Sequence, residues 1–88
     1  MKINIEEINN EKIAIIETKN IVMNDVDSAV DILGNCNYQG ALKIVINKEN
    51  IKPEFFDLKT RIAGEILQKF SNYRMQLAIV GDFTEYRR

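Results

Sequence analysis

The chain has 88 residues, of which 45% are hydrophobic, and its 12 basic and 13 acidic residues leave a net charge of −1. This length predicts a single domain over residues 1–88, and the composition excludes a disordered chain. The balanced charge provides no basic field for nucleic acid or an acidic membrane. No apolar stretch approaches the ~20 residues of a membrane helix.

Two residue types that carry much of enzyme chemistry are scarce. The sequence has no histidine and a single cysteine, Cys36. This excludes a Ser-His-Asp triad, a Cys-His pair and zinc sites built from histidine or several thiolates. Cys36 is expected to be a small, half-buried apolar residue at a helix end, with a reactive thiol as the alternative.

The same features point to a compartment and a class. No disulfide can form within the chain, and the N-terminus lacks the apolar core of a signal peptide. We therefore expect a cytoplasmic protein. We also expect it to be no enzyme, with no catalytic residues, no cofactor and no metal site.

Two strands open the chain. Ile3 and Ile5 alternate with polar residues, which predicts a half-buried strand over roughly residues 2–8. Residues 12–18 predict a second strand. The Asn-Asn-Glu segment at residues 9–11 favours a turn, because asparagine tolerates positive φ, so a hairpin is the simplest connection.

A short helix is predicted over residues 25–34. Asn24 or Asp25 can accept hydrogen bonds from the free N–H groups at its start. Apolar residues then recur at helical spacing as far as residue 33. Gly34 offers a left-handed stop, so residues 35–40 are expected to form a loop.

The second half of the chain predicts a β-α-β unit. Residues 41–46 are a β-branched run typical of a parallel strand buried on both faces. Pro53 suits the first turn of a helix, and apolar residues then recur at three- and four-residue steps to about residue 72. Residues 75–80 predict the last strand. The fold class is α/β with the order β-β-α-β-α-β, and the crossover should be right-handed.

Three motifs lie in order along the chain: NCNYQG at residues 35–40, FFDLKT opening the segment 55–73, and LAIVGDF at residues 77–83. Together they resemble the bacterial family catalogued as domain of unknown function 4180. The resemblance implies a sheet with helices packed on it, similar in layout to the STAS domains of sulfate transporters and anti-sigma-factor antagonists. Relatives continue past the last motif with a helix, a strand and a helix. The resemblance therefore implies that a chain ending at Arg88 is C-terminally truncated relative to the family.

One charge falls within the apolar stripe of the predicted second helix. On a helix that begins at Pro53, Lys59 lies in the middle of that stripe. The helix start should lie near the C-terminal ends of the parallel strands, where open α/β sheets bind ligands. We expect Lys59 to be a structural lysine that reaches water or pairs with Asp57 or Asp82. The alternative is a small polar site of Asp57, Lys59, Asp82 and the helix N-terminus that could hold an anion.

The functional expectation is correspondingly general. The sequence predicts a non-enzymatic regulatory or protein-interaction module. The alternative is a small-molecule or anion-binding domain that uses the strand-end rim near Lys59. The last strand is too apolar to form an exposed edge, so we expect a homo-oligomer or another protein partner to cover it. No nucleic acid and no membrane are expected as partners.

Overall fold

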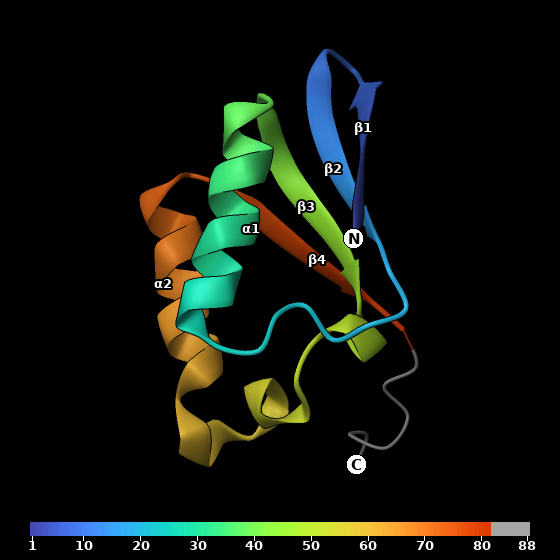
Figure 1. Ribbon diagram of the computed structural model, residues 1–88. Helices are drawn as coiled ribbons and strands as arrows, with labels where there is room; N and C mark the ends of the chain where they lie inside the picture. Colours follow the sequence, from blue (N-terminus) through green and yellow to red (C-terminus); the bar gives the residue numbers. More distant parts are fainter. Residues whose placement is uncertain (82–88) are drawn as a thin grey trace.

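The computed structural model of the chain describes residues 1–81, which form one four-stranded sheet with two α-helices packed against it (Figure 1). The order β-β-α-β-α-β and the α/β class are confirmed. In chain order the elements are β1 (Lys2–Ile8), β2 (Glu11–Glu17), α1 (Val26–Tyr38), β3 (Ala41–Asn47), the short 3-10 turns η1 (Lys48–Asn50), η2 (Pro53–Phe56) and η3 (Leu58–Thr60), α2 (Ile62–Asn72) and β4 (Gln76–Val80).

The first two strands form the predicted hairpin. Ile8 pairs with Glu11, so only two residues make the connection. Asn9 and Asn10 have φ values of 53° and 69°. Two successive positive φ angles define the turn whose twist matches that of the flanking strands, and asparagine adopts them at low cost. The turn prediction is confirmed at both positions.

The order of the strands decides where the helices lie. The sheet order is β1-β2-β3-β4, and β3 is parallel to both of its neighbours. When successive parallel strands are added in one direction, crossovers of the same hand all pass over the same face of the sheet. Both helices accordingly cover one face (Figure 1). No described element covers the other, which we call the bare face.

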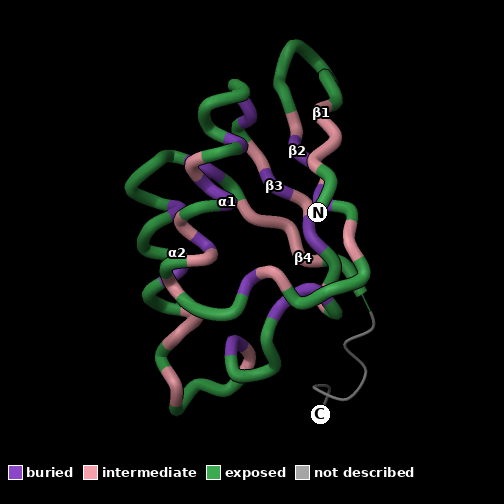
Figure 2. The backbone as a smooth tube through the Cα atoms, viewed as in Figure 1, coloured by how far each residue is buried: buried purple, intermediate pink, exposed green. Residues whose placement is uncertain are grey.

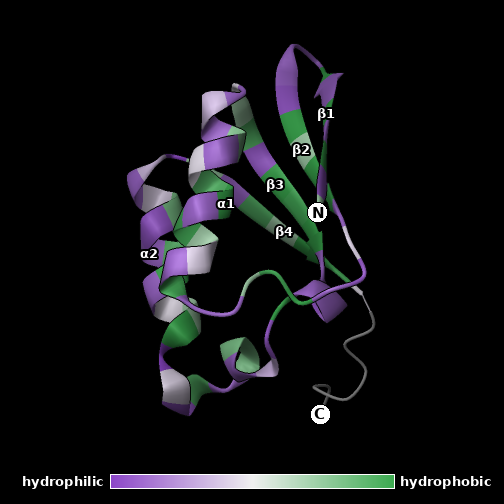
Figure 3. Ribbon diagram, viewed as in Figure 1, coloured by the Kyte–Doolittle hydropathy of each residue, from purple (hydrophilic) through white to green (hydrophobic). Residues whose placement is uncertain are grey.

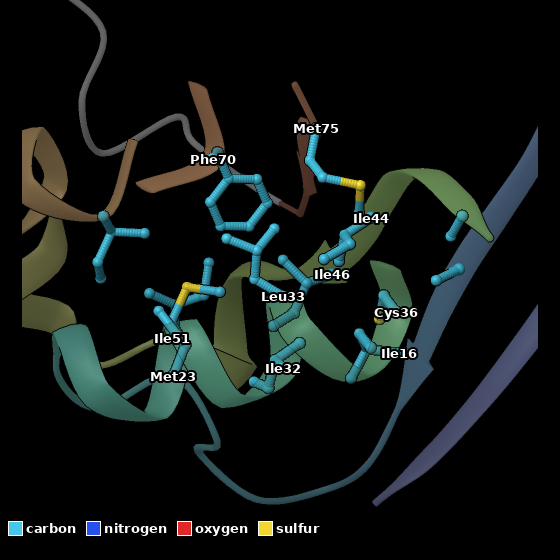
Figure 4. Packing of buried hydrophobic residues seen from close by; sticks show 14 of the residues in the cluster. Ile16, Met23, Ile32, Leu33, Cys36, Ile44, Ile46, Ile51, Phe70 and Met75 are labelled. Carbon is cyan, nitrogen blue, oxygen red and sulfur yellow. The ribbon is translucent and has the colours of Figure 1, made fainter. Parts of the chain in front are cut away.

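The core lies between the covered face and the helices. Alternate strand residues such as Ile16, Ile44 and Ile46 point into it, where they meet Leu33 of α1 and Phe70 of α2 (Figure 4). Buried residues therefore lie on the helix side of the sheet, and the outer surfaces of both helices are exposed (Figure 2). The buried residues form one continuous core, as a small domain requires.

The prediction that residues 41–46 are buried on both faces is wrong. Lys43 and Val45 point away from the helices and are only half-buried, and Leu42 is exposed. Leu42 lies where the pairing of β3 with β2 shifts by one residue. A β-branched run suits any strand, whether one of its faces is covered or both.

The first helix begins as predicted. The Asp25 carboxylate accepts the Ser28 N–H at 2.8 Å, and the Ser28 hydroxyl accepts the Asp25 N–H at 3.0 Å. This reciprocal pair satisfies two N–H groups that the helix leaves unpaired. Hydrogen bonds from the Ser28 backbone and side chain lower the pKa of the Asp25 carboxyl.

The end of that helix was predicted four residues too early. α1 continues to Tyr38, so residues 35–38 of the predicted loop are its last turn. Gly34 lies in the helix interior, and a Cβ added there would meet no atom within 4 Å. The left-handed glycine is Gly40, with φ of 87°. Gly40, and not Gly34, therefore provides the left-handed residue that was predicted to end the helix.

The predicted helix from Pro53 to about residue 72 is also wrong in its first half. Asp57 is extended (φ −97°, ψ 113°), and Arg61 is left-handed (φ 61°). Only Ile62–Asn72 is α-helical, and the segment before it consists of η2 and η3.

Local side-chain hydrogen bonds explain the interruption. The Asp57 carboxylate accepts the Lys59 N–H at 3.0 Å. The Thr60 hydroxyl donates to the carbonyls of Glu54 and Asp57, at 2.6 and 2.8 Å. Short polar side chains that bind the nearby backbone offer it an alternative to the helical hydrogen-bond ladder.

The two glycines at the end of α1 give a matched prediction. Gly34→Ala should raise the free energy of unfolding by about 1 kcal/mol, because alanine favours the helix and the space is open. Gly40→Ala should lower it by about 1–2 kcal/mol, because an L-residue is strained at positive φ. Thermal and urea unfolding measure both. Equal effects of the two changes would contradict the helix boundary described above.

Candidate functional site

The C-terminal ends of the three parallel strands form one rim, and a buried amide holds the segments that cross it. Asn50 is 2% exposed, and its side-chain NH₂ donates to the carbonyls of Thr18 and Asn20, each at 3.0 Å. The backbone carbonyl of Asn50 accepts the N–H groups of Val22 and Met23, at 2.9 and 3.1 Å. Asn50 therefore ties the β2–α1 connection to the segment that leaves β3.

This tie extends into a short stretch of parallel pairing. Met23 and Ile51 form an isolated bridge, and the Lys52 N–H donates to the Met23 carbonyl at 3.0 Å. The Asn50 Oδ1 atom is buried and has no hydrogen-bond partner among the described residues. Sequence reasoning missed Asn50, because an asparagine in a polar loop ordinarily indicates a turn. Its only signal was its place directly before the apolar Ile51.

The predicted site residues are only partly brought together. Asp57 and Lys59 lie two residues apart in the chain and are joined by the hydrogen bond from the Lys59 N–H to the Asp57 carboxylate. The Lys59 residue is exposed. The premise that it falls within an apolar helical stripe is wrong, because the chain around it is a 3-10 turn. Asp82 lies outside the described residues.

A hollow of about 410 Å³ opens at the start of α2. No side-chain hydrogen bond from Arg61 caps this helix. Uncapped N–H groups at a helix start favour negative charge. The carboxylates of Asp57 and Glu65, which line the hollow, oppose the binding of an anion there. The residues that line the hollow are Asp57, Leu58, Arg61, Ala63, Gly64 and Glu65.

Among residues 1–81, no three His, Cys, Asp or Glu side chains gather closely enough to hold a metal ion. Within the same residues, no helix is long and apolar enough to cross a membrane. The rim and the hollow present hydrogen-bonding groups, apolar side chains and exposed charges.

Comparison with known proteins gives a family and no activity. The family described as Domain of unknown function (DUF4180) matches residues 8–88. The chain belongs to this family. No curated protein and no solved structure matches it.

The cysteine of this DUF4180 domain is a core residue. Cys36 is fully buried in the last turn of α1. Burial raises the pKa of its thiol to about 11. A thiol with such a pKa holds almost no thiolate at neutral pH and is a poor nucleophile. Cys36 lies at the helix end, as predicted, but it is fully buried where the sequence predicted a half-buried residue.

The bare face of the sheet is a further distinctive surface of the DUF4180 domain. Strand residues alternate between the core and this face, and Figure 3 shows that β3 and β4 are largely hydrophobic along their length, so this face also carries apolar residues. Half-buried apolar residues lie at its centre, and charged and amide side chains surround them. The central apolar residues are Ile13, Ile15, Val45 and Ala78.

Proposed function

We propose that this DUF4180 domain is a non-enzymatic protein-interaction module, and that a partner chain adds a strand along the outer edge of β4. The observation that carries the proposal is the state of this edge. β4 is the last strand of the sheet, and no described strand pairs with its outer side. An open edge presents a row of backbone N–H and C=O groups, which is a template for another strand.

Within residues 1–81, the β4 edge lacks three features that usually protect sheet edges: charged residues, proline and a bulge. Its five residues, Gln76–Val80, carry no charge and no proline. Their pairing with β3 runs without a register shift from Gln76 to Val80, so no bulge twists the edge away. The opposite edge strand, β1, carries Lys2, Glu6 and Glu7. This asymmetry favours β4 as the edge that receives a partner.

The proposal predicts where on the domain an extended peptide binds. Peptides selected from a display library against the folded domain should shift the NMR signals of Gln76–Val80 and slow amide exchange there. The β1 edge is the internal control, and its amides should not change. Binding that perturbs β1 or the outer surface of α2 while leaving β4 unchanged would contradict the proposal.

A second candidate function is anion binding at the start of α2, the alternative that the Lys59 neighbourhood favours. Arg61 beside the hollow supports it, as do the N–H groups that follow Ile62 at the helix start. The Ile62 N–H itself donates to the Thr60 hydroxyl at 3.3 Å. Titration with inorganic phosphate should then shift the amide signals of Ala63 and Gly64, and Arg61→Met should weaken the effect severalfold. Lys59→Met tests the predicted role of Lys59 separately. Identical titration curves for the wild type and both variants would remove this candidate.

A further inference from the structure

The bare face is organised in rows that cross the sheet. The pairing registers place Asn4, Ile15, Val45 and Ala78 in one row, with one residue from each strand. All four are half-buried. We call this the middle row. The covered face can be told apart because the neighbouring residues, such as Ile44 and Ile79, pack into the core.

A charged row lies on each side of the middle row. The row two residues further along the strands in one direction consists, in sheet order, of Glu6, Ile13, Lys43 and Gln76. In the other direction, Lys2 lies opposite Glu17. The Asn4 side chain donates to Glu17, which confirms that these two side chains share the face.

The signs of these charges are arranged for a two-fold axis along the middle row. Such an axis would stack the bare faces of two copies with each strand over its own counterpart. Glu6 of one copy would then face Lys2 of the other, and Lys43 would lie beside Glu17 of the other. The middle rows, which are apolar except for Asn4, would meet each other. This is an aligned packing of two sheets with a self-complementary contact surface.

The other simple arrangement fits less well. Either axis would place a charged side chain over Ile13 of the second copy, Glu17 in the first arrangement and Lys43 in the second. An axis along the strands, between β2 and β3, would however place Glu6 over Gln76 and Lys2 over Val80, so it would form no ion pair at the rim. The four charges also sum to zero, so a second copy is not repelled as it would be by a surface of one sign.

From this we infer that the bare face binds a second copy of this chain, with Val45 and Ile15 at the centre and Glu6–Lys2 pairs at the rim. The inference is independent of the β4 edge, because it uses side chains of the bare face and no backbone groups of the edge. Its occupant is specified by the charge pattern.

The size of the face sets the expected affinity. Four strands about 4.8 Å apart and five residues of about 3.3 Å each give a footprint of roughly 300 Å². Stable complexes bury about 800 Å² of accessible surface per partner. The dimer should therefore be weak and reversible, with a dissociation constant on the order of 0.1 mM.

Sedimentation equilibrium from about 10 µM to about 1 mM, which brackets that constant, tests the inference. The wild-type chain should pass from monomer to dimer. Val45→Glu should weaken the dimer at least about tenfold, because two carboxylates would meet at the centre. Leu58→Glu is the matched control, since Leu58 is 91% exposed and lies outside the sheet. It should leave the dissociation constant unchanged.

A charge exchange at the rim tests the orientation and does not depend on Val45. Glu6→Lys and Lys2→Glu should each weaken the dimer severalfold, and the double variant should recover it. Both residues are exposed, so neither change threatens the fold. A dimer through the β4 edge would be insensitive to all these changes and would overturn the inference while leaving the proposed function standing.

Three further outcomes would overturn it. The first is a wild-type chain that stays monomeric at about 1 mM, an order of magnitude above the expected constant. The second is equal weakening by Leu58→Glu and Val45→Glu. The third is a monomer that dimerises only once residues 82–88 are removed, which would assign the bare face to the chain's own C-terminal segment.

Discussion

The addition of β2, β3 and β4 in sequence order is the constraint on which the rest of this structure depends. Because each new parallel strand joins the same edge, crossovers of one hand carry both helices over one face. The single core between sheet and helices follows from this, with Ile44 and Ile46 at its centre. So does the bare face. A sheet that grew from both edges of β2 would have had helices on both sides and no such surface.

Much of the fold could be predicted from the sequence, since its signals are local. Asn9 and Asn10 specify the hairpin turn through their tolerance of positive φ, and alternating isoleucines mark the first strands. The element order follows from such signals. Which faces of β3 are covered could not be predicted, because Val45 suits a half-exposed sheet surface as well as a buried one. That property depends on strand order, which lies outside any one segment.

The errors in the helices have an equally physical origin. Gly34 and Gly40 both offer a helix stop, and only the tertiary structure shows which of them adopts positive φ. The helical periodicity after Pro53 is real, but the Asp57 carboxylate and the Thr60 hydroxyl compete for the backbone and break the helix. The predicted position of Lys59 depended on that helix being continuous. The break in the helix therefore removes the main reason for expecting an anion site at Lys59. Asn50, which holds the rim together, was not predicted from the sequence.

The two proposed interaction surfaces consist mainly of backbone groups and apolar side chains. The described residues hold no histidine, a buried unreactive cysteine and no cluster of metal ligands. What they offer instead is an unprotected strand edge and a bare sheet face that meet along β4. Both suit contact with protein chains, one through backbone hydrogen bonds and the other through side chains.

The central claim, that the sheet has one covered face and one bare face, is tested most directly by the thiol accessibility of neighbouring residues on β3. Val45→Cys and Ile44→Cys differ by one position and should point to opposite faces. Cys36 is buried and serves as the internal reference. In dilute, monomeric protein, the thiol at position 45 should react with a thiol reagent far faster than the thiol at position 44, which should react only on unfolding. Equal protection of both thiols in the monomer would contradict the account.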